Sequence, residues 1–179
     1  MKKARLILRI LALVFYSAAV IGLFCPFIWQ IEYAKGGTIG GSNSGMEAGL
    51  NFGAFPQNLP NFLAIVFIVI GFVASLVYLF VTIIKNEKSN KKKKGQPEEV
   101  KEFSSAKYLL SIAIFGILCG FVPFLCCSLT LDAYGIAGDQ AIINGIHVGY
   151  FIGEGAAISG VGALFGGMCL FFTSSGILD

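Results

Sequence analysis

The five cysteines and the single histidine are the side chains best suited to chemistry in this sequence. A membrane thiol oxidoreductase needs paired reactive thiols, and C-x-x-C is the spacing that commonly supplies them. That spacing is absent, and all five cysteines lie in strongly apolar stretches (Cys25, Cys119, Cys126, Cys127 and Cys169). We therefore interpret them as small apolar packing residues. A single disulfide between Cys25 and Cys126 is the alternative.

Metal and nucleotide chemistry also lack a supporting pattern. His147 shares the predicted outer loops with Glu47, Asp139 and Glu154, but their spacing does not match that of a zinc site. No P-loop, nucleophile elbow or metalloprotease helix occurs. We predict no catalytic residue, no cofactor and no metal site, and we place His147 on the solvent side of a strand.

The composition predicts the elements that surround these residues. The chain is 56% hydrophobic and only 13% charged, with a mean hydropathy of +0.80. A helix needs about 20 apolar residues to cross a bilayer. Four segments qualify, at about 6–31, 62–84, 108–131 and 155–178. The predicted fold class is mainly α, as a single integral membrane domain with four transmembrane helices.

The distribution of charge predicts the orientation. Of the 13 basic residues, four precede or enter the first segment and eight lie in the loop at 85–107. Lys35 alone lies on the other side. By the positive-inside rule both termini are cytoplasmic, and the loops at about 32–61 and 132–154 lie outside a plasma membrane. Nucleic acid is not an expected partner, because topology accounts for the basic charge.

Two basic features face the cytoplasmic leaflet of the bilayer in this prediction. The lysine cluster at 85–94 belongs to a loop that cannot build a core, so we predict that 85–107 is mobile. The lysines either only set the topology or bind anionic lipid headgroups or a cytoplasmic partner. Arg9 either extends its guanidinium to the headgroups or acts as a functional intramembrane arginine.

Two pairs of similar motifs indicate an internal repeat. GMEAGLNFG at 45–53 and GIHVGYFIG at 145–153 both have glycine at their first, fifth and ninth positions. FCPF at 24–27 recurs as FVPF at 121–124. The motifs follow the same order along the chain, which favours duplication of a helix–loop–helix unit.

The predicted repeats cover 6–84 and 108–178 and enter the membrane in the same direction. Pro26 and Pro123 would bend equivalent helices near the outer surface, because proline lacks an N–H and clashes with the preceding turn.

The two glycine-spaced stretches also alternate in polarity, as strands with one buried face do. Turn residues upstream, together with strand-like segments at 29–34 and 128–134, predict a hairpin in each outer loop. The hairpins would pair into a small extracellular β-sheet, since a lone hairpin is only marginally stable. Irregular loops, with 133–153 partly re-entrant, are the alternative. The glycines of this predicted cap are Gly45, Gly49, Gly53, Gly145, Gly149 and Gly153.

Small residues predict where the helices approach one another closely. The fourth segment has the longest series (Gly155, Ser159, Gly162, Ala163, Gly166 and Gly167), and the third has Gly116 and Gly120. We predict that these residues pack the bundle. The alternative is that the fourth helix also contacts another subunit. Trp29 and Tyr33 fall where the first helix should leave the membrane, as interface anchors do.

The outline is similar to that of claudin-type tetraspan proteins, which have two extracellular loops and internal termini. The similarity is one of topology and implies no function or site here, because the paired loop cysteines and the tryptophan motif of that family are absent. We predict a non-enzymatic assembly, scaffold or accessory subunit that acts through its outer loops and helix packing, as a homo-oligomer or within a membrane-protein complex. The alternative is an oligomeric channel or transporter component with the fourth helix at the pore or subunit interface.

Overall fold

The computed structural model describes residues 2–34, 37–50, 59–92, 106–125, 140–143 and 146–174. Four of its helical segments are long and apolar enough to cross a membrane. They are α1 (Lys2–Gly22), α3 (Leu59–Lys92), α4 (Ala106–Gly120) with helical residues 122–125 after it, and α6 (Glu154–Ser174). The apolar part of α1 has 19 residues, and at the helical rise it spans about 28 Å. The chain is a mainly helical, multi-pass membrane protein.

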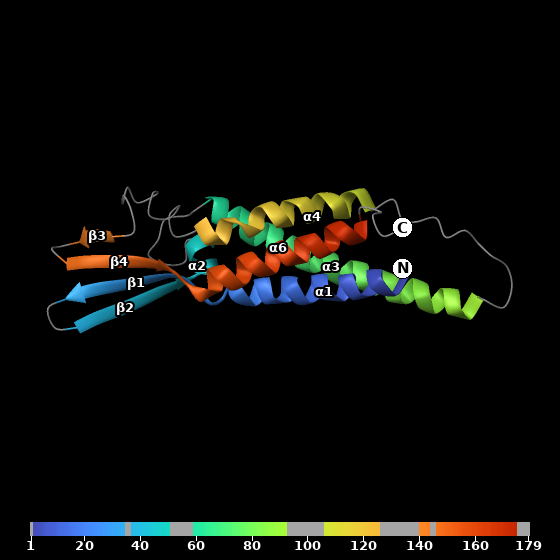
Figure 1. The fold of residues 1–179 in the computed structure, drawn as a ribbon, viewed down its shortest axis with the longest axis horizontal. Coiled ribbons are helices and arrows are strands. Elements are labelled where there is room, and N and C mark those ends of the chain that lie inside the picture. Colours follow the sequence, from blue (N-terminus) through green and yellow to red (C-terminus); the bar gives the residue numbers. More distant parts are fainter. Residues whose placement is uncertain are drawn as a thin grey trace.

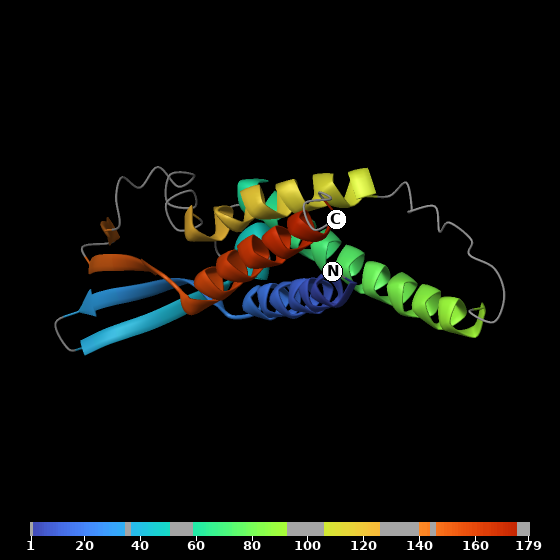
Figure 2. The same ribbon diagram turned by 45° about the vertical axis from the view of Figure 1, so that its right-hand side comes forward.

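Helix α6 occupies the centre of the bundle. It packs against α1 and α4, and α3 packs against the same two helices (Figures 1 and 2). Over its most apolar window 56% of α6 is buried, compared with 17–28% for the other spans. The many glycines and alanines of α6 make it slender, which allows its neighbours to surround it. The start of α1 and the end of α6 lie at the same end of the bundle.

A four-stranded antiparallel sheet extends from the opposite end of the bundle (Figure 1). Its strands are β1 (Pro26–Ala34), β2 (Gly37–Ser44), β3 (Gln140–Ile143) and β4 (Ile146–Ile152), in the order β2-β1-β4-β3. The central pair aligns Trp29 with Phe151 and Ile31 with Gly149. Since β1 follows α1 and β4 precedes α6, the closely packed helices α1 and α6 place the two central strands side by side.

A β-bulge in β1 lies at the junction of the sheet and the helix bundle. The register between β1 and β2 shifts between Pro26 and Ile28, so that Phe27 is an extra residue in β1. Phe27 and Ile28 are consecutive, yet both are fully buried. They share a core with Leu23 of the α1 end and Tyr150 of β4. The bulge thus lets one strand supply two neighbouring side chains to the junction of sheet and helices.

The short helix α2 (Gly45–Leu50) ties β2 to the start of α3. Ser44 and Glu47 form a capping box, in which the Ser44 N–H donates to the Glu47 carboxylate at 2.8 Å and the Glu47 N–H donates to the Ser44 hydroxyl at 3.3 Å. The buried Asn61 amide, in the first turn of α3, donates to the Gly45 carbonyl at 3.2 Å. These bonds fix the hairpin of β1 and β2 against the helices.

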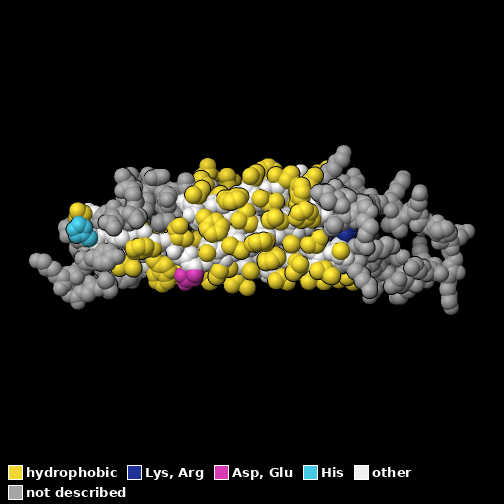
Figure 3. Space-filling model, in the orientation of Figure 1, with side chains coloured by type: hydrophobic (Ala, Val, Ile, Leu, Met, Phe, Trp, Pro, Cys, Tyr) yellow, Lys and Arg dark blue, Asp and Glu magenta, His cyan; other side chains and the backbone are white. Residues whose placement is uncertain are grey.

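Hydrophobic side chains cover the visible outer face of the bundle (Figure 3). On α1 and α3 the exposed apolar residues recur at helical spacing (Ile7, Ile10, Leu11, Val14, Val69, Val73, Val77 and Phe80). A soluble monomer rarely exposes so large an apolar surface. Lipid hydrocarbon is the solvent that suits this band of side chains.

The first membrane helix is shorter than the sequence predicted. Helix α1 ends at Gly22, and Pro26 begins β1, so the predicted helix bend at Pro26 is wrong. Cys25 precedes the proline, a position at which helical backbone is disfavoured. Trp29 consequently lies in a strand instead of at a helix end. Pro123 lies in the first turn of helical residues 122–125, after a turn at Phe121, where its missing N–H breaks no helical bond.

Two further boundaries differ from the predictions. Residues 45–50 form α2 instead of a strand, because the capping box starts a helix there. Of the strand predicted at 145–153, residues 146–152 form β4. Helix α3 continues to Lys92, so the first part of the loop predicted to be mobile is helical. The remainder of that loop, 93–105, and the strand predicted at 128–134 lie outside the described residues.

The sheet order bears on the predicted repeat. Two equivalent hairpins related by a twofold axis would bring equivalent strands to the centre, either β1 with β3 or β2 with β4. The centre instead pairs β1 with β4. The two glycine-spaced stretches also adopt different structures, one helical and one extended. The internal repeat is therefore not confirmed.

Candidate functional site

The small residues of α6 bring its backbone against that of α1. The side of α6 toward α1 carries one such residue in each turn (Gly155, Ser159, Gly162 and Gly166). A Cβ added to Gly162 would lie 2.6 Å from the carbonyl oxygen of Phe15 and 2.8 Å from the amide nitrogen of Ala19. Backbone atoms cannot move aside as a flexible side chain can, so this position accepts only glycine. The fully buried Ala163 lies beside this contact.

Ser159 adds a hydrogen bond to the same seam. Its hydroxyl donates to the Ala19 carbonyl at 2.8 Å, and both residues are buried. A Cβ on Gly22 would lie 2.5 Å from the Ser159 hydroxyl oxygen and 2.8 Å from the Ser159 amide nitrogen. The polar contact therefore depends on the absence of a side chain at Gly22.

Substitution Ser159→Ala is expected to weaken the bundle moderately. It removes the hydrogen bond to Ala19 without introducing a clash, and hydrogen bonds between membrane helices contribute about 0.6–2 kcal/mol. Equilibrium unfolding in mixed detergent micelles should show a loss of that size. The neighbouring exposed Ile158→Ala, which removes no hydrogen bond, is the matched control. Equal stability of Ser159→Ala and the wild type would show that the bond contributes nothing.

The opposite side of α6 contacts α4 in the same way. A Cβ on Gly167 would lie 2.9 Å from the Ala113 carbonyl oxygen, and one on Gly160 would lie 2.8 Å from the Gly120 carbonyl oxygen. Gly116 lies on the same side of α4 as Gly120, one turn earlier, and contacts the Tyr16 hydroxyl. The small residues predicted on the third and fourth membrane segments therefore pack within the chain, and α6 uses two separate faces to do so.

Tyr16 of α1 is the point at which all four membrane helices meet. Its side chain is fully buried. Three glycines line the space that the ring occupies, Gly71 of α3, Gly116 of α4 and Gly166 of α6, and a Cβ on any of them would collide with the ring or its hydroxyl. The Tyr16 hydroxyl has no hydrogen-bond partner among the described residues. We call this arrangement the Tyr16 cradle.

One face of the sheet carries exposed apolar side chains, and we call it the open face. Cross-strand pairing places Trp29 and Ile31 of β1, His147 and Phe151 of β4, and Ile142 of β3 on this face. Trp29, Phe151 and Ile142 are 37%, 44% and 68% exposed. On the opposite face Ile28, Val148 and Tyr150 are buried in the core. The sheet thus turns one apolar face inward and exposes apolar side chains on the other.

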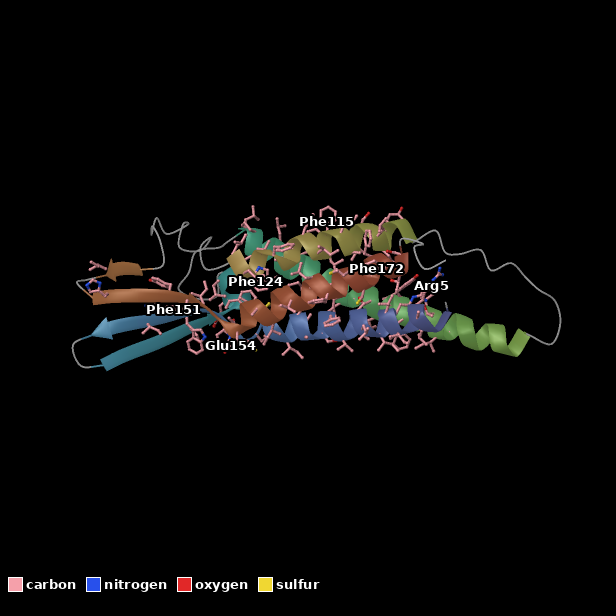
Figure 4. The ribbon with its side chains drawn as sticks, viewed as in Figure 1. Arg5, Phe115, Phe124, Phe151, Glu154 and Phe172 are labelled. Carbon is pink, nitrogen blue, oxygen red and sulfur yellow. The ribbon has the colours of Figure 1, made fainter. Side chains whose placement is uncertain are left out.

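The open face is fixed to the bundle by a polar contact. The Trp29 indole N–H donates to the Glu154 carboxylate at 2.9 Å, which joins β1 to the first residue of α6. Glu154 and Phe151 lie at the junction of the sheet and the bundle, whereas Arg5 lies at the far end of α1 (Figure 4). Trp29 and Phe151 are therefore near the edge of the apolar band, where tryptophan is enriched in membrane proteins.

Comparison with known proteins does not identify a family for this chain. No family model, curated protein or solved structure matches the chain.

Among the described residues there is no group of three metal-ligating side chains. Cys25, Cys119 and Cys169 are free thiols, while Cys126 and Cys127 lie outside the described residues. His147 is exposed on the open face, as predicted for the solvent side of a strand. An apolar groove of about 360 Å³ lies between α4 and α6 and faces the hydrocarbon, lined by Ile114, Ile117, Leu118, Met168, Phe171 and Phe172.

The glycines of the predicted cap have different surroundings. Gly45 begins α2, and a Cβ there would lie 2.6 Å from the ring of Phe27. Gly153 follows β4 and lies against the backbone of Pro26 and Phe27, accepting no side chain. Gly49 lies in α2 and Gly149 in β4. Gly53 and Gly145 lie outside the described residues.

Tyr16 was not among the residues predicted from the sequence, although its side chain contacts a glycine of each of the other three membrane helices. A signal was present, since Tyr16 is a polar aromatic residue in the middle of an apolar segment, and the other three segments each carry glycines. The sequence alone does not show which glycines lie at the same depth as Tyr16, because helix tilt and rotation depend on packing.

Proposed function

We propose that the chain is a non-enzymatic multi-pass protein of the plasma membrane that acts as an assembly, scaffold or accessory subunit. In this proposal the bundle is a rigid anchor and the open face is the surface that a partner subunit covers. The partner is a membrane protein or a second copy of the chain, with an apolar surface at the level of the sheet.

The observation that carries the proposal is the uncovered apolar surface of the open face. Ile142 is 68% exposed, although it lies in β3 at the sheet end, away from the apolar band of the bundle. Lipid contact accounts for Trp29 and Phe151 near the membrane edge, but not for Ile142. With Ile31, Trp29 and Phe151 on the same face, Ile142 gives the open face an apolar character that is typical of protein–protein interaction sites.

Charge supports the orientation of this proposal. The start of α1, with Arg5 and Arg9, lies at the end of the bundle opposite the sheet, and so does the lysine-rich end of α3 (Figure 1). Basic residues near membrane helices are retained on the cytoplasmic side. Both termini are then cytoplasmic and the sheet is extracellular. In this orientation the lysine cluster at 85–94 faces the inner leaflet, whose anionic headgroups attract clustered lysines.

A channel or transporter component is the less favoured function. It would place α6 at a pore or subunit interface, yet the small residues of α6 contact α1 and α4 of the same chain. The charged residues of the four described spans are Arg5, Arg9 and Glu154, and all three lie close to a membrane boundary. Transport pathways usually need polar groups at the membrane midplane.

The partner can be tested with a charge placed on either face of the sheet. Ile142→Glu puts a carboxylate on the open face, and Gly41→Glu puts one on the other face, where a Cβ meets no atom within 4 Å. We expect Ile142→Glu to lose the co-purifying subunit in mild detergent, because a buried unpaired charge is costly. Gly41→Glu should retain it at wild-type stoichiometry.

Unfolding measurements on both variants establish that the chain itself is intact. Purification of the wild type as a lone monomer would contradict the proposal, as would retention of the partner by Ile142→Glu. Ion conduction by a symmetric homo-oligomer in liposomes would favour the channel instead.

A further inference from the structure

Arg9 is held in a fixed position at the end of the bundle opposite the sheet. Its Nη1 donates to the Thr82 hydroxyl at 2.7 Å, and its Nη2 donates to the Tyr78 hydroxyl at 2.8 Å. Its Cζ lies 4.2 Å from the centroid of the Tyr78 ring, within the range of a cation–π contact. The guanidinium therefore packs against α3 instead of extending freely toward the headgroups.

The partners of Arg9 are neutral, so its positive charge is not balanced among the described side chains. The described carboxylate side chains are those of Glu47 and Glu154, and both belong to elements at the sheet end. Two of the five guanidinium N–H groups donate to the hydroxyls, and Nε is buried without an acceptor. A charge at a membrane boundary needs a counter-charge or water, and the half-buried Arg9 remains accessible for one.

The hydroxyls of Thr82 and Tyr78 differ in whether their hydrogen is still available for a hydrogen bond. Thr82 donates its hydrogen to the Tyr78 carbonyl at 2.7 Å, so it only accepts from Arg9. The Tyr78 hydroxyl accepts from Arg9 and has no acceptor for its own hydrogen among the described residues. Arg9 and Tyr78 together thus present N–H and O–H donors at one place, which suits a phosphate oxygen.

This group lies close enough to the membrane boundary to reach a lipid phosphate. The apolar span of α3 ends at Ile84, two residues after Thr82. At the helical rise this is about 3 Å. The guanidinium is therefore just inside the hydrocarbon boundary, within reach of the phosphate of a lipid whose headgroup lies directly above it. Basic pockets between membrane helices are known to bind anionic headgroups at this level.

We infer that Arg9 and the Tyr78 hydroxyl form a site for the phosphate of an anionic phospholipid. The site lies between α1 and α3, at the end of the bundle opposite the sheet. Thr82 positions the guanidinium. This site uses other residues than the lysine cluster at 85–94, and it does not depend on the subunit role proposed above.

Native mass spectrometry of the full-length protein, titrated with phosphatidylglycerol or phosphatidylcholine of the same acyl chains, tests the site. We expect tighter retention of phosphatidylglycerol by the wild type and a loss of at least about tenfold in that affinity for Arg9→Gln. A combined Lys88→Gln, Lys91→Gln and Lys92→Gln variant should retain the tight lipid. Inorganic phosphate should not compete with it; competition would assign the site to free phosphate.

Tyr78→Phe keeps the ring and the cation–π contact and removes only the hydroxyl. It therefore tests the phosphate site if Arg9→Gln does not fold. We expect it to weaken the selective binding several-fold. Equal retention of both lipids by the wild type would overturn the inference. So would unchanged selectivity in Arg9→Gln or Tyr78→Phe, or loss of all selectivity in the lysine variant.

Discussion

Gly166→Val should lower the free energy of unfolding of the bundle by about 2–3 kcal/mol, the upper part of the usual range for overpacking a well-packed core. A Cβ at Gly166 would lie 2.7–3.1 Å from ring carbons of Tyr16. The ring cannot retreat, because Gly71 and Gly116 already touch it from the other helices. Either α6 or α1 must therefore shift, which separates the most extensive helix contact of the molecule. Equilibrium unfolding in mixed micelles measures the loss.

Substitutions of Tyr16 itself show whether the Tyr16 cradle is the cause. Tyr16→Ala in the Gly166→Val background should restore part of the lost stability relative to the sum of the single changes, with a coupling of about 1 kcal/mol or more. Tyr16→Phe should leave stability unchanged within about 1 kcal/mol, because the hydroxyl has no partner among the described residues. Additive effects in the double variant would argue against direct contact between Gly166 and Tyr16.

Gly22→Val should be comparably destabilising, and it should also disturb the sheet. A Cβ at Gly22 would meet the Ser159 hydroxyl at 2.5 Å and the Gly155 carbonyl oxygen at 3.0 Å. Since α1 leads into β1 and β4 leads into α6, separation of these two helices also separates the central strands. Trp29, the only tryptophan of the chain, reports on this junction through its bond to Glu154.

The expected result for Gly22→Val is a loss of about 2–3 kcal/mol together with a shift in tryptophan emission. Gly41→Val is the matched control, because Gly41 has no atom within 4 Å of an added Cβ. It should leave both the stability and the emission near those of the wild type. Wild-type behaviour of Gly22→Val would contradict the close approach of α1 and α6.

The sequence predicted the four membrane helices and the small residues that pack them, because apolar length and small-residue spacing are direct requirements of the bilayer. Gly155, Ser159, Gly162 and Gly167 all lie in helix contacts. It did not predict that α6 would use two faces, one for α1 and one for α4. That depends on the arrangement of all four helices, which single-segment patterns do not contain.

The errors occurred where local chemistry competed with a weak periodic pattern. At 45–50 the glycine spacing and alternation indicated a strand, but Ser44 and Glu47 start a helix with a capping box. At Pro26 the apolar run continued past the proline, but the chain left the helix at Gly22 and entered β1. β3 was not predicted, because Gln140–Ile143 is too short for a clear alternation.

We propose that the sheet and the lysine-rich end of α3 lie on opposite sides of the membrane, with the sheet outside. Single substitutions Gly41→Cys and Lys92→Cys can be labelled with a membrane-impermeant maleimide in intact and permeabilised cells, measured above the labelling of the unsubstituted chain. We predict that Gly41→Cys is labelled in intact cells and that Lys92→Cys is labelled only after permeabilisation. Labelling of both positions from the same side, or of Lys92→Cys alone in intact cells, would contradict this orientation.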